Sequence, residues 1–154
     1  MTELLLWRHA EAFDAGAACD DLARALTPRG LRQAARVAAW LAPRLPARTR
    51  VLASPAERAQ QTAAALGRHV RIVHALAPGG TVDDLLAAAR WPDARGAVLV
   101  VGHQPTLGLA AARLVARVSQ PWSVRKAGLW WLRVRERAGV PQVVLRAVVD
   151  PDQL

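Results

Sequence analysis

The sequence is poor in cysteine and contains no long apolar run. Cys19 is the only cysteine among 154 residues, so no intramolecular disulfide can form, and a reducing compartment is the simplest expectation. The start of the chain has only a short apolar run, residues 4–7, before Arg8. A secretory signal needs a longer run, and a membrane span needs about 20 apolar residues. We therefore expect a cytoplasmic protein with no membrane segment.

Lysine is almost absent as well, because Lys126 is the only one, although the formal net charge is +9. The remaining positive charge is arginine, which is scattered through the sequence, whereas a nucleic-acid-binding arm would concentrate it. We expect a solvated basic surface and no nucleic-acid partner. The length and the hydrophobic content of 53% predict one ordered domain over residues 1–154.

Short apolar runs alternate with longer amphipathic stretches, a pattern typical of α/β folds with a largely parallel sheet. The expected strands are 4–7, 50–53, 70–74 and 97–101. The expected helices are 28–42, 55–67, 82–90 and 105–117. The alternating tail, 129–135 and 143–149, predicts a closing antiparallel hairpin with its turn at 138–141. The expected fold class is a three-layer α/β/α sandwich with a C-terminal hairpin.

Residue types at the helix starts refine these expectations. Thr27 is expected to cap the first helix, with Pro28 in its first turn. Ser54 and Glu57 have the spacing of a capping box for the second helix. The residues of the first helix expected to face the core are Leu31, Ala34, Ala35, Ala38 and Leu41. In the hairpin, the alternation predicts that Trp130 and Trp131 pack on opposite faces.

Polar side chains follow three of the expected strands. The first strand ends in Arg8 and His9, the second leads to Ser54 and Arg58, and the third ends in Gly102 followed by His103. If the strands are parallel neighbours, these residues meet at the carboxyl edge of the sheet, where open α/β folds bind their ligands. The N-termini of the following helices would add free backbone N–H groups suited to an anion.

Two histidines and two arginines without an acidic cluster suit phosphoryl chemistry. Arginine binds phosphoryl oxygens bidentately, and a neutral imidazole can attack phosphorus to give a covalent intermediate. A second histidine could donate to an equatorial oxygen in the transition state. The other histidines, His69 and His74, have no metal-ligand spacing and are expected at the surface. We expect no metal and no other cofactor.

Four segments resemble the motifs of the histidine phosphatase (phosphoglycerate mutase-like) superfamily. Segment 6–12 (LWRHAEA) resembles its Arg-His-Gly/Ala opening, 26–30 (LTPRG) its Leu-Thr-x-x-Gly helix start, 54–62 (SPAERAQQT) its Ser-Pro-x-x-Arg-Ala-x-x-Thr segment, and 101–105 (VGHQP) its Gly/Ser-His-x-Pro segment. The short chain and the loop 76–80 are most similar to the SixA-type phosphohistidine phosphatases.

The resemblance implies roles for residues in these segments. His9 would be the nucleophile, Arg8 and Arg58 would bind phosphate, and His103 would complete the pocket. Arg24 matches the position of a further phosphate-binding arginine in SixA-type proteins. The remaining candidate substrate-binding residues are Ser54 and Gly102, and Lys126 is expected at the pocket rim.

The chain departs from ester-cleaving members of the superfamily, which usually carry a glutamate acid in mid-chain. Residues 79–84 (GGTVDD) show no clear match, although Asp83, Asp84 or Glu11 could serve as an acid. Imidazole leaves phosphorus more easily than an alkoxide does, so a site without that acid fits a phosphohistidine substrate.

The sequence therefore favours a phosphatase acting on phosphohistidine in a protein, for example a phosphotransfer protein, and working as a monomer or weak dimer. Two alternatives stay open. One is a phosphatase for small-molecule phosphate esters, and the other is a non-catalytic module that binds phosphorylated ligands.

Overall fold

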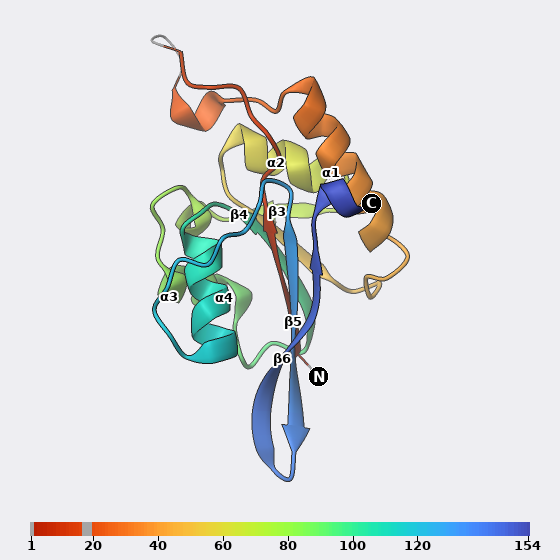
Figure 1. Cartoon of the computed structure of the whole chain (residues 1–154), viewed down its shortest axis with the longest axis vertical. Helices are drawn as coiled ribbons and strands as arrows, with labels where there is room; N and C mark the ends of the chain where they lie inside the picture. The colour runs from red at the N-terminus through yellow and green to blue at the C-terminus, as the bar shows by residue number, and fades with distance from the viewer. Residues whose placement is uncertain (1, 17–19) are drawn as a thin grey trace.

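The computed structural model describes residues 2–16 and 20–154, so Cys19 lies outside the described residues (Figure 1). The strands are β1 (Thr2–Arg8), β2 (Arg50–Ala53), β3 (Val70–Ile72), β4 (Gly96–Gly102), β5 (Leu129–Arg137) and β6 (Val140–Val149). The α-helices are α1 (Pro28–Leu41), α2 (Glu57–Ala64), α3 (Val82–Ala89) and α4 (Thr106–Ala116). Short 3₁₀ turns occur at Asp21–Ala23 (η1), His74–Leu76 (η2) and Pro151–Gln153 (η3).

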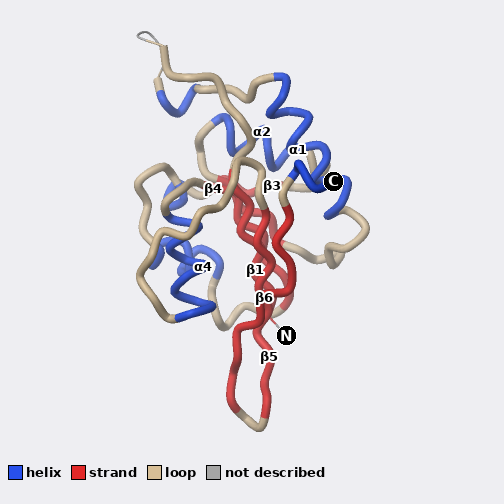
Figure 2. Tube along the Cα trace, in the orientation of Figure 1, coloured by secondary structure: helices blue, strands red, loops and turns tan. Residues whose placement is uncertain are grey.

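One sheet runs through the molecule in the order β3-β2-β4-β1-β5-β6 (Figure 2). The first four of these strands are parallel, and β5 and β6 are antiparallel to their neighbours. The last residues of β1 and β4, Arg8 and Gly102, lie directly opposite each other in the register. The carboxyl ends of three neighbouring parallel strands therefore meet at one edge, as the sequence predicted.

Helices cover both faces of the sheet (Figure 1). One core packs α1 and α2 against the sheet, and a second core packs α3 and α4 against the opposite face. Trp131 is buried in the first core, whereas Trp130 packs against the second. These two layers of helices and the sheet between them confirm the α/β/α sandwich, and the far ends of β5 and β6 project beyond it as a hairpin.

The start of α1 is fixed by a close backbone contact. The Thr27 side chain accepts from the Gly30 N–H at 3.0 Å, and the Thr27 N–H donates to the Glu11 carbonyl, also at 3.0 Å. A Cβ on Gly30 would collide with the same carbonyl. The helix spans 28–41, one residue shorter than the predicted 28–42. Its core face is rotated from the predicted one, because Leu31 is 50% exposed and Ala35 is also exposed. Its buried residues are Gly30, Ala34, Val37, Ala38 and Leu41.

The prediction for the start of α2 is wrong. The helix begins at Glu57, and its N-cap, Ala56, has no side-chain capping bond. The Ser54 hydroxyl accepts from the Ala56 N–H, two residues on rather than three, at 3.1 Å. Ser54 therefore lies outside the helix. Its hydroxyl instead closes a short turn with Ala56 and pairs with His103. No helix in the described ranges is long and apolar enough to cross a membrane.

Candidate active site

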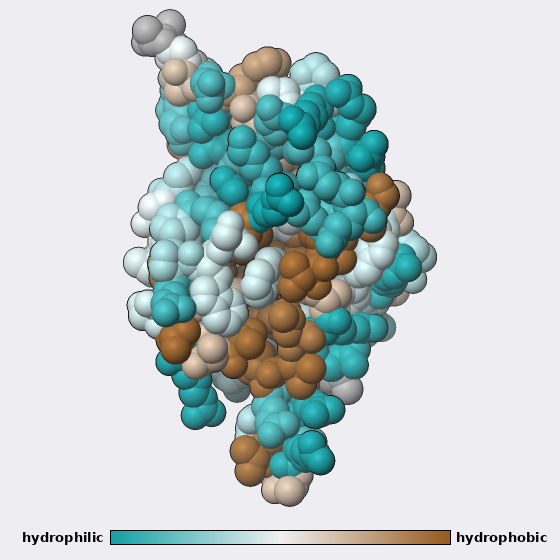
Figure 3. Space-filling view, viewed as in Figure 1, coloured by the Kyte–Doolittle hydropathy of each residue, from teal (hydrophilic) through white to brown (hydrophobic). Residues whose placement is uncertain are grey.

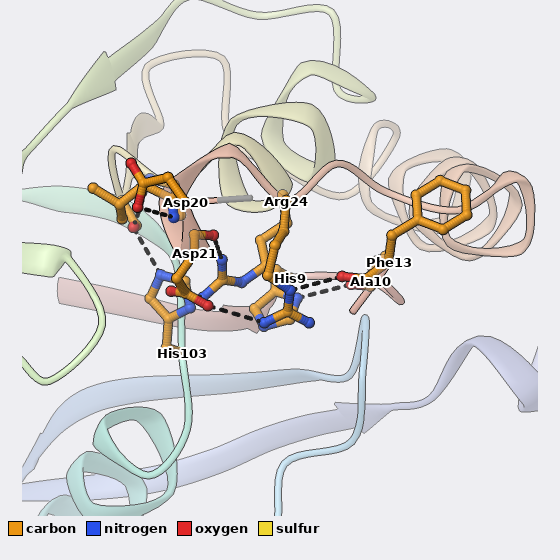
Figure 4. Close-up of polar contacts among 11 residues, drawn as sticks. His9, Ala10, Phe13, Asp20, Asp21, Arg24 and His103 are labelled. Atoms are coloured by element: carbon orange, nitrogen blue, oxygen red, sulfur yellow. Dashed lines mark hydrogen bonds and ion pairs between the residues drawn. The ribbon is translucent and has the colours of Figure 1, made fainter. Parts of the chain in front are cut away.

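The two predicted site histidines lie side by side at the carboxyl edge of the sheet (Figure 4). The ring centroids of His9 and His103 are 5.2 Å apart, and the rings are inclined by 53°. The His9 N–H donates to the Gly102 carbonyl at 3.1 Å, which ties the end of β1 to the end of β4. Both side chains are buried, being 8% and 5% exposed. The Gly102 carbonyl thus joins the segment that contains His9 to the segment that contains His103.

The tautomer of His9 is set by its own loop. His9 Nδ1 lies 2.8 Å from the Ala10 carbonyl oxygen, and because a carbonyl only accepts, this nitrogen carries the proton. The lone pair of the neutral ring is therefore on Nε2. Thr62 of α2 steadies the loop, since its hydroxyl accepts from the Ala10 N–H at 3.0 Å and donates to the Arg58 carbonyl at 2.7 Å. A nucleophilic imidazole needs a ring nitrogen with a free lone pair and a fixed ring orientation, and His9 Nε2 meets both conditions.

His103 is held by Ser54. The Ser54 Oγ lies 2.7 Å from His103 Nε2 and already accepts from the Ala56 N–H. A hydroxyl that accepts from one neighbour can donate its single proton to the other. With Ser54 donating to Nε2, the proton of the neutral His103 ring is on Nδ1. That N–H is then available as a donor to a ligand oxygen.

Each of the two predicted arginines, Arg8 and Arg58, uses some of its N–H groups in hydrogen bonds and leaves another without an acceptor. Arg58 is 4% exposed and donates from Nη1 to the Asp21 carbonyl at 2.8 Å and from Nη2 to the Asp21 carboxylate at 3.2 Å. Arg8 donates from Nη1 to the Val124 carbonyl at 2.9 Å. The Nε atoms of both arginines are buried and have no hydrogen-bond acceptor among the described residues. Buried donors without acceptors are rare in proteins.

Arg24 also lies at the site, brought there by the loop that leads into α1 (Figure 4). Its Nε donates to the Phe13 carbonyl at 2.6 Å and its Nη1 to Asp21 Oδ1 at 3.2 Å. Asp21 was missed by the sequence analysis, although it accepts from both Arg24 and Arg58. The only sequence signal was its position three residues before Arg24.

Burial and positive charge keep both imidazoles neutral. The pKa of His9 is lowered to about 4, mainly by burial; the hydrogen bond to Ala10 opposes this shift, and the charges of Arg58, Arg8 and Arg24 add to it. Burial, followed by the neighbouring His9 and Arg58, lowers the pKa of His103 to about 3. The site therefore combines two neutral imidazoles with three guanidinium groups, which suits a dianionic ligand.

The three carboxylates considered as acids lie in different places. Asp83 is exposed and pairs with Arg113 at 2.6 Å, and Asp84 forms the capping box of α3 with Thr81. Glu11 lines a hollow of about 310 Å³ together with Arg8, and its Oε2 is buried without a hydrogen-bond donor from the described residues. Glu11 is thus the only one of the three that borders a predicted site residue.

The histidines assigned to the surface are where they were expected, because His69 and His74 are exposed. Lys126 lines the hollow that contains Arg8, and this hollow includes none of the other predicted site residues. Within the described residues, no group of three or more His, Cys, Asp or Glu side chains is arranged to hold a metal ion.

Comparison with known proteins identifies relatives along most of the chain. A family model described as the histidine phosphatase superfamily (branch 1) matches residues 4–79. An uncharacterized protein of Mycobacterium tuberculosis is 39% identical over 118 residues, which cover 73% of this chain and 71% of the relative. A protein of a Picosynechococcus species is 37% identical over 139 residues, covering 85% of this chain and 84% of that one.

Solved structures share the fold over nearly the whole chain. The structure of a Nakamurella multipartitia protein assigned as the phosphohistidine phosphatase SixA is 34% identical with a TM-score of 0.77, covering 97% of this chain and 96% of that one. The protein histidine phosphatase SixA complexed with tungstate is 25% identical with a TM-score of 0.80, covering 98% of each chain. Phosphoserine phosphatase from Entamoeba histolytica, at 17% identity and a TM-score of 0.70 over the full length of both chains, shares the fold.

Proposed function

Since this chain belongs to the histidine phosphatase superfamily, and hence to a family of phosphatases, we propose that it hydrolyses phosphohistidine on a protein through a phosphorylated His9. The observation that carries the proposal is the meeting of two buried, neutral imidazoles, His9 and His103, with the guanidinium groups of Arg8, Arg58 and Arg24. Because His9 Nε2 has a lone pair, donors for a phosphoryl group and a nucleophile occur together.

The reaction has two displacements at phosphorus. In the first, the lone pair of His9 Nε2 forms a bond to phosphorus while the bond from phosphorus to the substrate nitrogen breaks. The substrate ring, protonated on its other nitrogen, takes that electron pair and leaves as neutral imidazole. In the second, water attacks the phosphorus of phospho-His9 while the bond from phosphorus to Nε2 breaks and its electron pair returns to His9. One proton of the water passes to bulk solvent, and inorganic phosphate and neutral His9 are released. Arg8, Arg58 and Arg24 would hold the non-bridging oxygens, and His103 Nδ1–H would donate to one of them.

The leaving group supports phosphohistidine as the substrate. An alkoxide needs a proton as it departs, whereas a departing imidazole nitrogen is much less basic. Asp83 and Asp84 are engaged elsewhere, on α3. A SixA-type relative of 34% identity that matches nearly the full length supports the same substrate class.

A small-molecule phosphate ester is the second candidate substrate, because Glu11 lies in the hollow next to Arg8 and its Oε2 accepts no hydrogen bond from the described residues, with Arg29 3.8 Å away as its ion-pair partner. In that case Glu11 would protonate the leaving oxygen. Glu11→Gln should then abolish ester turnover while leaving the turnover of a P–N substrate, such as phosphoramidate, within about twofold of the original rate.

The decisive test is a trapping experiment on the intact protein. Mixing it with a histidine-phosphorylated protein and quenching within milliseconds should leave acid-labile, alkali-stable phosphate on His9. His9→Ala should abolish both this phosphate and turnover, while inorganic phosphate still binds. A protein that binds phosphate but never becomes phosphorylated would be a binding module, and ester turnover far above phosphohistidine turnover would favour the second candidate.

A further inference from the structure

A basic surface runs from the candidate active site along α1. It begins in the hollow of about 310 Å³ that contains Arg8, and a second hollow of about 240 Å³ continues it. The two hollows share Arg29, Gln33 and Asp152, so they adjoin each other. The second hollow adds Arg32 and Arg36. We call this surface the α1 tract.

The arginines of the tract lie along one side of the helix. Arg29, Arg32 and Arg36 are three and four residues apart, the spacing that places side chains on one helical face. All three are exposed. At a rise of 1.5 Å per residue, they extend roughly 10 Å from the first turn of α1. Figure 3 shows hydrophilic residues gathered over this part of the molecule.

The charge of the tract is only partly balanced within the chain. Arg29 pairs with Glu11 at 3.8 Å, and Arg125 pairs with Asp150 at 2.9 Å. In the described residues, Arg32, Arg36 and Lys126 make no ion pair, although they line the same two hollows. The tract therefore has a net positive charge, and its side chains without an ion pair can bind carboxylates of another molecule.

We propose that the α1 tract is the docking surface for the protein substrate, and that the substrate carries an acidic surface beside its phosphorylated histidine. This inference rests on the proposed function and names the surface by which the partner is recognised. The phosphoryl group would enter between Arg8 and His9, and the carboxylates next to it would lie over Arg29, Arg32 and Arg36. Opposite charges would speed association and set the orientation of the partner.

The test separates docking from chemistry. The probe is an acidic phosphotransfer domain, used without phosphate for binding and after phosphorylation with phosphoramidate for turnover. The variant Arg32→Glu/Arg36→Glu changes two exposed side chains outside the catalytic residues. The matched control, Arg71→Glu/Arg90→Glu, makes the same charge change at exposed positions in a separate hollow that includes Arg50.

At low salt, the α1 variant should bind the unphosphorylated domain about tenfold more weakly than the original protein, and this difference should fade as salt is added. Turnover of free phosphoramidate should stay unchanged. The control should bind as the original protein does. Equal weakening in both variants, or none in the α1 variant, would overturn the docking proposal. Because binding is measured without phosphate, absence of phosphohistidine turnover would count against the proposed function alone.

Discussion

Asp21 holds Arg58 through two different acceptors. The Asp21 carbonyl accepts from Nη1 at 2.8 Å, and its carboxylate accepts from Nη2 at 3.2 Å. The same carboxylate also accepts from Arg24. These contacts leave the buried Nε of Arg58 without an acceptor. An aspartate in the loop before α1 therefore fixes the orientation of two guanidinium groups proposed to bind phosphate, one of which comes from α2.

Replacing Asp21 by Asn should weaken phosphate binding through the arginines. The neutral amide keeps one acceptor oxygen but loses the charge that balances Arg24 and Arg58. We expect kcat/KM to fall about tenfold, and the inhibition constant for inorganic phosphate to rise by a similar factor. Thermal unfolding should change little, because the Asp21 side chain is 51% exposed.

The matched control for this experiment is Asp83→Asn, which removes a different exposed aspartate–arginine pair, that with Arg113. It should leave both kinetic values unchanged. If Asp21→Asn left the phosphate inhibition constant at its original value, Asp21 would have no part in positioning the arginines.

Ser54→Ala should reduce kcat more than it changes KM. Without the hydroxyl at 2.7 Å, His103 loses the hydrogen-bond partner of its Nε2, which orients the ring. We expect a fall of about tenfold to a hundredfold, which is typical for a lost orienting hydrogen bond at a donor that acts in the transition state. Rapid-quench kinetics should show slower formation of phospho-His9. Ser54→Thr, which keeps the hydroxyl, should recover much of the rate, and failure of both variants alike would indicate a packing defect.

Acidic pH should destabilise the protein through its two buried histidines. The folded-state pKa values of His9 and His103, about 4 and about 3, lie below the ordinary value of 6.5. The unfolded chain therefore binds protons first as the pH falls below 6.5. The free energy of unfolding should fall by up to about 1.4 kcal/mol per pH unit for each histidine between pH 6.5 and pH 4.

Urea unfolding at pH 7, 6 and 5 measures this slope. The variant His9→Gln/His103→Gln should show a flatter dependence on pH. Replacing the exposed His69 and His74 is the control, and it should keep the original slope. An unchanged slope in the His9 and His103 variant would mean that these rings titrate normally in the folded protein.

Gly30→Ala should separate α1 from the loop that follows β1. The new methyl group would collide with the Glu11 carbonyl, which also accepts from Thr27 N–H. We expect a loss of about 1–3 kcal/mol in the free energy of unfolding, the usual cost of overpacking. Urea unfolding measures this, and Gly16→Ala is the control, because a Cβ there meets no atom. Equal stability of the two variants would contradict the close contact.

Much of the fold could be read from local patterns. The apolar runs predicted β1 and β4, and the alternation predicted β5 and β6, because burial on one or both faces sets the period of a strand. The hairpin turn is shorter than predicted, since β6 begins at Val140, inside the predicted turn 138–141. Thr27 does cap α1 as predicted. Two predictions were wrong: that Leu31 faces the core, and that Ser54 caps α2. At both places a tertiary contact outweighs the local pattern. Which side of α1 is buried depends on its close approach to Glu11, and the start of α2 depends on the pairing of Ser54 with His103.

The sequence by itself determined the order of strands and helices along the chain, and it placed His9, Arg58 and His103 at or just after strand ends. That these ends meet at one edge was decided by the tertiary structure, which makes β2, β4 and β1 parallel neighbours. Only the tertiary structure decided how these groups are charged and held. Burial of the two imidazoles, the pairing of Ser54 with His103, and the hold of Asp21 on Arg24 and Arg58 arise between segments far apart or in loops. Such contacts depend on three-dimensional distances, which local sequence patterns do not contain.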